Sequence, residues 1–444
     1  MILPPSYLSL PVKFRREVRP EVYPKPEIAI YNDELAKQLG VDLRDANILS
    51  GAIIQPGTTP LALGYAGHQF GNYTVLGDGR AVLLGEIESP DGKRWDIQLK
   101  GSGRTPFSRR GDGRASLGPM LREYIMSEAL AALGIPTTRS LAVLTTGESV
   151  FRFAQEPGAI LVRVAASHLR IGTFEYATDD EVGTLADFTI QRHYPELLTQ
   201  DDKYYRFLSH VIARQGKLVA QWMSIGFIHG VMNTDNVALS GETIDFGPCA
   251  FMNRYDPATT YSSIDTQGRY AFGNQPSIMH WNLARFAETL LPLLADATEV
   301  AIKRAEEALQ TFPVVFNAEL ERLMSQKLGG ALSSLEELYR WMYEIGADYT
   351  NTFADLSLAE PSSSDDRFRA WHAKWKESVS QEIKNHHVIP RNRLVEEALV
   401  AAAQESNLTP LHEIVSVLRR PYERPHIKYR SADDTADYRT FCGT

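Results

Sequence analysis

The stretch that decides the fold is HGVMNTDN at residues 229–236, followed by IDFG at residues 244–247. The first segment begins with a histidine and ends seven positions later at Asn236, and the second places Asp245 before a phenylalanine and a glycine. Asp245 comes nine positions after Asn236, a spacing that suits a short hairpin that brings the two side chains together. Amide and carboxylate oxygens are good ligands for Mg²⁺. The stretch therefore predicts a divalent-metal site made by Asn236 and Asp245.

Protein kinases carry the same order of groups. Their histidine-led loop ends in a metal-binding asparagine, and a D-F-G turn then supplies a metal-binding aspartate. A D-F-G triplet alone is weak evidence, but the triplet together with the upstream loop at this spacing is a specific signal. The sequence therefore predicts an α+β, protein-kinase-like fold of two lobes, a small β-rich N-lobe and a larger α-helical C-lobe, which binds ATP with a divalent metal.

One kinase residue is missing from this stretch. The kinase loop has its catalytic aspartate two residues after the histidine, where this chain has Val231. Valine cannot accept a proton or orient a hydroxyl group, so ordinary phosphoryl transfer is in doubt. Asp235 is the nearest carboxylate that could act as the base. It could instead be a turn residue or a hydrogen-bond partner of the metal ligands.

The patterns on either side of the stretch predict the order of the lobes. Strands are expected at 81–87 and 95–99 around an Asp-Gly turn, and at 140–145 and 159–165, with a helix from Ser116 to Gly134 between the two pairs. Later segments, such as 204–225 and 282–294, have helical periodicity. We expect four parts: an extended N-terminal wrap (1–60), the N-lobe with the phosphate cradle (61–172), the C-lobe with the metal-binding loop (173–400), and a C-terminal tail packed on the lobes (401–444).

Lys100 ends the second predicted strand, as the phosphate-binding lysine of a kinase ends its third strand. In kinases this lysine pairs with a helix glutamate, and the following helix offers Glu123 and Glu128. The two lie about 140° apart around a helix, so both cannot face one lysine. Periodicity does not choose between them.

Glycines and arginines cluster around Lys100. Residues 77–80 read GDGR, and residues 101–114 hold four glycines and four arginines. Arg163 lies within an apolar run and would need an anionic partner if buried, and Arg170 follows it. Guanidinium groups and backbone N–H groups suit phosphate oxygens, so a polyphosphate cradle is the preferred interpretation. A hairpin turn at 77–80, a solvated loop at 101–114 and a structural salt bridge at Arg163 are the alternatives.

The composition of the chain limits the kinds of partner that we expect. The chain has 444 residues, 43% of them hydrophobic and 23% charged, and a net charge of −9, which argues against nucleic-acid binding through a general basic surface. It has no signal-peptide pattern and no apolar run of the roughly 18 residues that a membrane helix needs. We therefore expect a cytoplasmic protein, monomeric, without nucleic-acid or membrane partners.

The two cysteines, Cys249 and Cys442, exclude a disulfide framework and a cysteine-based zinc site. They could form a redox switch of the active-site segment. Alternatively, Cys249 is a small buried hydrophobic residue and Cys442 a solvent-exposed bystander.

Several motifs together resemble the selenoprotein O family of AMP-transferring pseudokinases. They occur in one order over nearly the whole chain: 65–71 (YAGHQFG), 76–80 (LGDGR), 98–103 (QLKGSG), 133–139 (LGIPTTR), 162–164 with 167–170 (VRV, SHLR), 229–236, 267–272 (QGRYAF), 274–276 (NQP) and 418–421 (LRRP). The chain ends without the selenocysteine that names the family, so selenium chemistry is not expected.

The resemblance implies an adenylyltransferase that binds ATP in reverse relative to a kinase and transfers AMP to Ser, Thr or Tyr hydroxyls of proteins, releasing pyrophosphate. It favours Glu123 as the partner of Lys100. Asp235 would be the base, and Asn236 and Asp245 would hold Mg²⁺ or Mn²⁺. The nucleotide would be held by Gly77, Gly79, Arg80, Lys100, Asp112, Gly113, Arg163 and Arg170. A conventional kinase that uses Asp235, and a non-catalytic ATP-binding scaffold suggested by Val231, remain alternatives.

Overall fold

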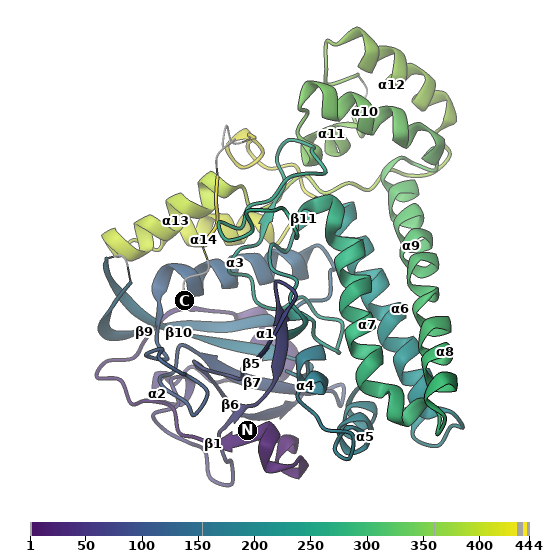
Figure 1. Ribbon diagram of the computed structural model, residues 1–444. Coiled ribbons are helices and arrows are strands. Elements are labelled where there is room, and N and C mark those ends of the chain that lie inside the picture. Colours follow the sequence, from purple (N-terminus) through teal and green to yellow (C-terminus); the bar gives the residue numbers. More distant parts are fainter. Residues whose placement is uncertain (1, 153, 359, 433–437, 442–444) are drawn as a thin grey trace.

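The computed structural model describes residues 2–152, 154–358, 360–432 and 438–441, and it has two lobes (Figure 1). The N-lobe is built on an antiparallel eight-stranded sheet. Seven strands follow the order β1-β3-β6-β7-β10-β9-β2, and β8 pairs with β10. Their bounds are β1 Arg15–Glu17, β2 Glu27–Tyr31, β3 Leu61–Leu63, β6 Ala81–Glu88, β7 Arg94–Lys100, β8 Ala115–Ser116, β9 Arg139–Phe151 and β10 Gln155–Ala165.

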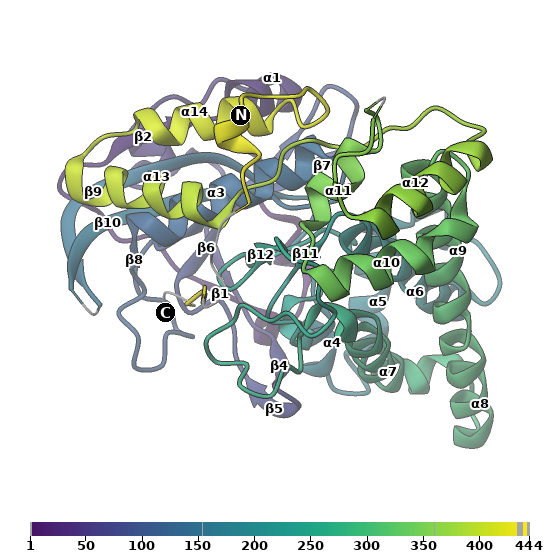
Figure 2. The same ribbon diagram turned by 90° about the horizontal axis from the view of Figure 1, so that it is seen from above.

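Helix α3 (Leu117–Ala132) packs on strands β9 and β10 of this sheet. Its other side is covered by α13 (Asn392–Glu405) and α14 (Thr409–Leu418), as Figure 2 shows. Because both sides are covered, most residues of α3 are buried, including charged ones. A buried charge needs a partner, so the glutamates of α3 are placed to form ion pairs.

The C-lobe is mainly helical. Its helices are α4 Ile171–Glu175, α5 Val182–His193, α6 Lys203–Ser224, α7 Gln275–Leu294, α8 Thr298–Leu309 and α9 Thr311–Lys327. A second cluster, α10 Leu335–Ile345, α11 Tyr349–Asp355 and α12 Asp366–Ser378, projects at the upper right of Figure 1. It has an aromatic core that includes Trp341, Trp371 and Trp375.

Two small hairpins flank the stretch that decides the fold. Strands β11 (Phe227–Ile228) and β12 (Ala250–Phe251) pair on either side of residues 229–249 and close them into a loop. Strands β4 (Ala66–Gln69) and β5 (Asn72–Val75) form a separate hairpin. Within this loop, Thr234–Asn236 form a short 3₁₀ helix, which contains Asp235 and Asn236.

The fold confirms the predicted α+β class, the four predicted strands and the helix that begins after Ser116. The helix predicted over 204–225 is α6, whereas the one predicted over 282–294 begins earlier, at Gln275, with Pro276 in its first turn. The first 60 residues are more regular than an extended wrap. They supply edge strands β1 and β2 and two short helices, α1 (Asp33–Leu39) and α2 (Ala46–Leu49).

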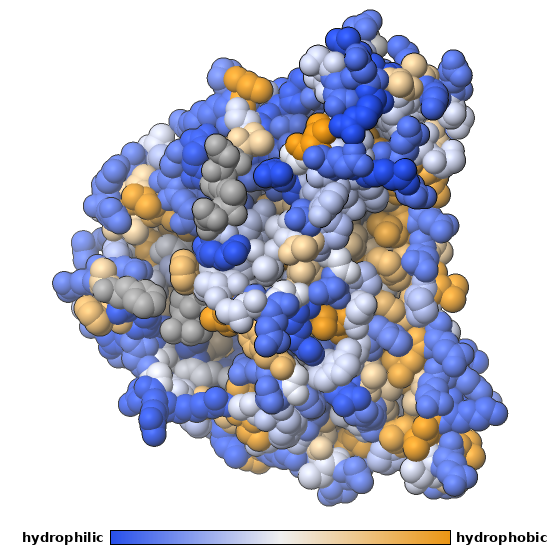
Figure 3. Space-filling view, turned by 45° about the horizontal axis from the view of Figure 1, so that its top comes forward, coloured by the Kyte–Doolittle hydropathy of each residue, from blue (hydrophilic) through white to orange (hydrophobic). Residues whose placement is uncertain are grey.

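The surface in Figure 3 is mainly hydrophilic, with scattered hydrophobic residues. Within the described ranges, no helix combines the length and the apolar character needed to span a bilayer. Cys442 lies outside the described residues.

Candidate active site

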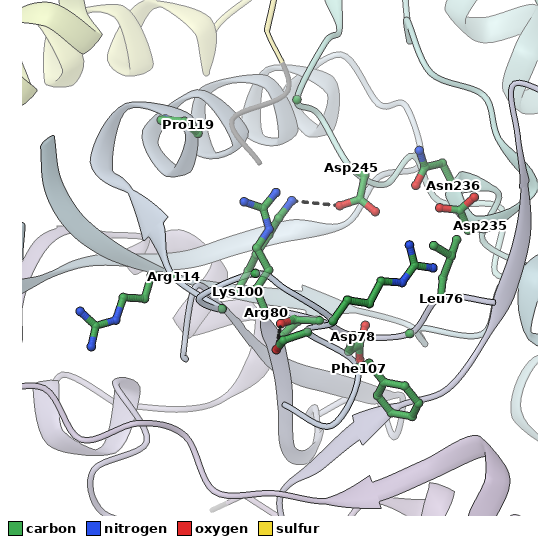
Figure 4. Close-up of a pocket in the computed structure, with 18 of the residues that line it drawn as sticks. Leu76, Asp78, Arg80, Lys100, Phe107, Arg114, Pro119, Asp235, Asn236 and Asp245 are labelled. Carbon is green, nitrogen blue, oxygen red and sulfur yellow. Dashed lines mark hydrogen bonds and ion pairs between the residues drawn. The ribbon is translucent and has the colours of Figure 1, made fainter. Parts of the chain in front are cut away.

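A cavity of about 700 Å³ lies between the two lobes (Figure 4). Its walls come from strands β6, β7 and β10, helix α3, the loops 76–80 and 107–114, Arg170 just before α4, and the segments 231–236 and 245–248. All the residues predicted for the nucleotide, the metal and the base line it: Gly77, Gly79, Arg80, Lys100, Asp112, Gly113, Arg163, Arg170, Asp235, Asn236 and Asp245. The fold thus brings together residues that are up to 168 positions apart in the sequence.

Asp245 is the electrostatic centre of the cavity. Its Oδ1 lies 2.9 Å from Lys100 Nζ and 3.2 Å from Arg163 Nη1, and its Oδ2 lies 3.1 Å from Arg170 Nη1. Burial alone would raise the pKa of Asp245, but the three cations hold that pKa well below its usual value. The residue has a left-handed backbone conformation, with φ of 64°. Asp245 is therefore ionised and aimed at the cationic wall of the cavity.

The partner of Lys100 is Glu123. Lys100 Nζ lies 2.6 Å from Glu123 Oε2, which confirms the choice that the resemblance favoured. Glu128, on another face of α3, instead receives two hydrogen bonds from Arg139, at 2.8 and 2.7 Å. This Lys–Glu pair between a strand and a helix has the same arrangement as the pair that positions the phosphate-binding lysine in protein kinases.

Asp235 lies at the opposite side of the cavity from Lys100, beside Asn236 (Figure 4). Its Oδ1 is buried and forms no hydrogen bond of ordinary geometry with the described residues, although the Gln69 side chain interacts with the carboxylate and lowers its pKa. Burial raises the pKa of Asp235 to about 6, although the nearby Arg170 lowers it. Arg170 Nη1 also donates to the backbone oxygen of Asp235, at 2.8 Å. A poorly hydrated carboxylate with an unused oxygen is the kind of group that can accept a proton from a substrate.

Asp78 is a cavity residue whose side chain the sequence analysis did not single out. Its Oδ2 accepts hydrogen bonds from the Leu63 N–H and from Gln98 Nε2, at 3.1 and 3.0 Å. Its Oδ1 lies 4.0 Å from Arg170 Nη2. Burial raises the pKa of Asp78. Asp78 lies between two glycines, so local pattern indicates no more than a turn residue.

The glycine-rich loop 101–114 is folded back on itself. Gly113 has φ of 72°, and a Cβ atom there would lie 2.1 Å from the Gly103 carbonyl oxygen. Both Nη atoms of Arg152 bind the carboxylate of Asp112, at 2.9 and 3.0 Å. Arg152, from the end of the β9–β10 hairpin, also lines the cavity. No local motif marks Arg152, so the sequence alone does not predict it as a cavity residue.

The oxygen donors near Asp245 fit a divalent metal. Asn236 Nδ2 donates to the Val231 carbonyl oxygen at 3.0 Å, which fixes the amide beside the cavity. Asp245 and Asn236 both face the cavity (Figure 4), and hard oxygen donors suit Mg²⁺ or Mn²⁺. In the described part of the chain, no group of three His, Cys, Asp or Glu side chains could complete such a site. Phosphate oxygens and water would have to supply the other ligands, as is usual for Mg²⁺ in ATP sites.

Comparison with known proteins gives the family. The family model described as protein adenylyltransferase SelO matches residues 3–382. Proteins named protein nucleotidyltransferase YdiU are similar over 99% of this chain: that of Brevibacillus brevis is 50% identical over 97% of its own length, that of Shouchella clausii 48% over 98%, and that of Nitrosococcus oceani 49% over 96%.

Among solved structures, ROP2 of Toxoplasma gondii, described as having a protein-kinase fold and no enzymatic activity, aligns with 63% of this chain and 84% of its own. The identity is 12% and the TM-score 0.29, too low to bear on the fold or the function of this chain. Family membership instead rests on the family model and on the relatives that are about 50% identical. The chain belongs to the SelO family of protein adenylyltransferases.

Proposed function

We propose that this chain transfers AMP from ATP to Ser, Thr or Tyr hydroxyl groups of proteins and releases pyrophosphate. The observation that carries the proposal is the convergence of three cations, Lys100, Arg163 and Arg170, on Asp245, with no carboxylate at position 231. Three buried cations are more than a kinase lysine site needs. They suit the γ- and β-phosphates of an ATP bound in reverse, so that the α-phosphate faces Asp235.

In this proposal the residues that line the cavity have different roles. The nucleotide is held by Gly77, Gly79, Arg80, Lys100, Asp112, Gly113, Arg163 and Arg170. Gly77 and Gly113 let the backbone approach the phosphates, and the guanidinium groups neutralise charge on the departing pyrophosphate. Asp112 contributes by fixing the loop through Arg152, since its carboxylate is already bound there.

Asp235 would accept the proton of the acceptor hydroxyl. At the same time the hydroxyl oxygen would bond to the α-phosphorus, and the bond between the α-phosphorus and pyrophosphate would break. With a pKa near 6, its carboxylate is mostly ionised at pH 7 and can take that proton. Mg²⁺ or Mn²⁺, held by Asn236 and Asp245, would neutralise phosphate charge when bound. The acceptors are proteins with accessible hydroxyl groups; we expect a monomeric cytoplasmic enzyme.

Incubation with ATP labelled at either the α- or the γ-phosphate tests this function. We expect protein-bound label only from the α-position, lost on treatment with EDTA and restored by Mg²⁺ or Mn²⁺. Label only from the γ-position would indicate a conventional kinase instead. Tight ATP binding without transfer from either position would indicate a non-catalytic scaffold.

A further inference from the structure

The β4–β5 hairpin lies directly against residues 233–235 of the loop that carries the proposed base. Strand β4 and the turn that follows it contact these three residues. Gly67 of β4 packs so closely on the Asp235 carboxylate that a Cβ atom there would overlap Oδ1. The His68 N–H donates to Thr234 Oγ1 at 2.7 Å, and the Phe70 N–H in the turn donates to Asn233 Oδ1 at 3.0 Å. The hairpin therefore forms one wall around Asp235.

The turn of this hairpin has a strained residue. Phe70 has φ of 51° and is followed by Gly71 with φ of 86°, so both central positions of the two-residue turn are left-handed. Such turns favour Asn or Gly, and this conformation costs a bulky L-residue about 1–2 kcal/mol. The Phe70 ring packs edge-on against Tyr270, with centroids 5.1 Å apart. A strained residue persists where its surroundings hold it, and such residues cluster at functional sites.

Asn233 joins the hairpin to a third segment. Its Oδ1 accepts the Phe70 N–H and also the Tyr270 hydroxyl, at 2.6 Å. Tyr270 belongs to the segment after Asp245 that returns to α7. Asn233 and Tyr270 are buried. One amide oxygen thus fixes the hairpin, the catalytic loop and this segment relative to one another, two residues before Asp235.

We propose that Phe70 is a positioning residue for AMP transfer: its turn holds the β4–β5 hairpin on the catalytic loop through Asn233 and so fixes the carboxylate of Asp235. The inference rests on the proposed function of Asp235. Misplacing a reacting group by about 1 Å can cost as much as 10²-fold in rate. ATP affinity should change little, since the cations proposed for its phosphates, such as Lys100 and Arg163, lie on strands of the main sheet.

Two substitutions at Phe70 separate positioning from folding. Phe70→Gly keeps the N–H that donates to Asn233 but removes the ring that packs on Tyr270, the second donor to Asn233. Phe70→Tyr keeps the ring. For AMP transfer from α-labelled ATP to casein, we expect Phe70→Gly to lower kcat about 10-fold at an unchanged KM for ATP, and Phe70→Tyr to retain kcat. Val75→Ala, on the exposed strand β5 of the same hairpin, is the control and should retain kcat. A wild-type kcat in Phe70→Gly, or a loss confined to KM, would overturn the proposal.

The route through Asn233 has its own test. If Phe70 acts through Asn233, the Phe70→Gly/Asn233→Ala double variant should lose little more kcat than Asn233→Ala alone. Additive losses would contradict this route.

Hydrogen–deuterium exchange supplies a readout that is independent of AMP transfer. Phe70→Gly should speed exchange at residues 233–237 and leave exchange in α6 unchanged. Unchanged exchange at 233–237 in Phe70→Gly refutes the proposal even if the wild type transfers AMP. If the wild type transfers no AMP but Phe70→Gly still exchanges faster at 233–237, the positioning role of Phe70 stands and only the proposed function is rejected.

Discussion

At the scale of single residues, Asp245 is the anion that three buried cations share. Asp245→Asn should lower AMP transfer by 10²-fold or more, because it weakens the proposed metal site. It should also destabilise the free protein by about 1–3 kcal/mol, because Lys100, Arg163 and Arg170 lose their charged acceptor. Activity assays and thermal melts measure the two effects. Asp179→Asn, at an exposed position, is the control. Full activity in Asp245→Asn would remove Asp245 from the metal site.

Lys327 is a buried cation without an ion pair among the described residues. Its Nζ lies 4.7 Å from the centroid of the Phe353 ring, and burial lowers its pKa to about 7. The ordinary lysine pKa is about 10.4, so between these values the unfolded chain binds more protons than the folded one. Stability should therefore rise with pH from about 7 toward 10, and the charged side chain should cost the fold up to roughly 4 kcal/mol at lower pH.

The corresponding substitution is Lys327→Met, which keeps the length of the apolar stem. We expect it to raise the free energy of unfolding at pH 7 by about 2 kcal/mol, and to flatten the increase between pH 7 and 9. Urea denaturation at several pH values measures both. Lys374→Met, at an exposed position of α12, should change neither. The assignment of the low pKa fails if Lys327→Met is no more stable than the wild type and keeps its pH dependence.

At the scale of elements, the loop 101–114 depends on the backbone of Gly113. In Gly113→Ala, the new Cβ would overlap the Gly103 carbonyl, and φ of 72° would add strain. The loop should open, and ATP affinity should fall about 10-fold as the loop's backbone N–H groups lose their placement. Isothermal calorimetry with ATP and Mg²⁺ measures this. Gly118→Ala, in α3 with open space around it, is the matched control and should bind ATP normally. Equal affinities in the two variants would exclude a phosphate-binding role for the loop.

Local pattern predicted the elements that carry their own signal. The β6–β7 hairpin has an Asp-Gly turn, and α3 has Ser116 and Pro119 at its start, so both were found. The β4–β5 hairpin was missed because its turn is Phe-Gly. A phenylalanine at positive φ depends on tertiary contacts, here with Tyr270 and Asn233, that local pattern does not show. Edge strands β1 and β2 were missed because they pair with strands far along the chain.

In the candidate site, too, the residues marked by local motifs were predicted, and those that depend on tertiary contacts were not. Asn236, Asp245 and Lys100 were found from motif spacing, and the structure gathers them in one cavity. The choice of Glu123 over Glu128 could not come from periodicity, because it depends on how α3 is rotated against the sheet and on Arg139 reaching Glu128. Arg152 was missed because its role depends on Asp112, forty positions away.

At the scale of the whole molecule, Arg391 ties distant parts of the chain together. It is 1% exposed, and it binds both carboxylate oxygens of Asp348, at 2.6 and 3.0 Å. It also donates to Asn253 Oδ1 and to the Arg430 carbonyl oxygen, at 2.7 and 3.0 Å. Asp348 in turn caps α11. Arg391 therefore joins the segment after β12, the α10–α12 cluster, helix α13 and the C-terminal segment.

Removing this arginine should loosen the whole molecule without touching the cavity, since Arg391 does not line it. Arg391→Met leaves Asp348 largely buried without its cation, so we expect a loss of about 3–5 kcal/mol in unfolding free energy. The kcat of the folded variant at 25 °C should stay close to the wild-type value. Urea denaturation and AMP transfer measure the two quantities. Arg340→Met removes an exposed pair with Glu336 on α10 and should cost less than about 1 kcal/mol. If the two variants are equally stable, Arg391 does not hold these segments together.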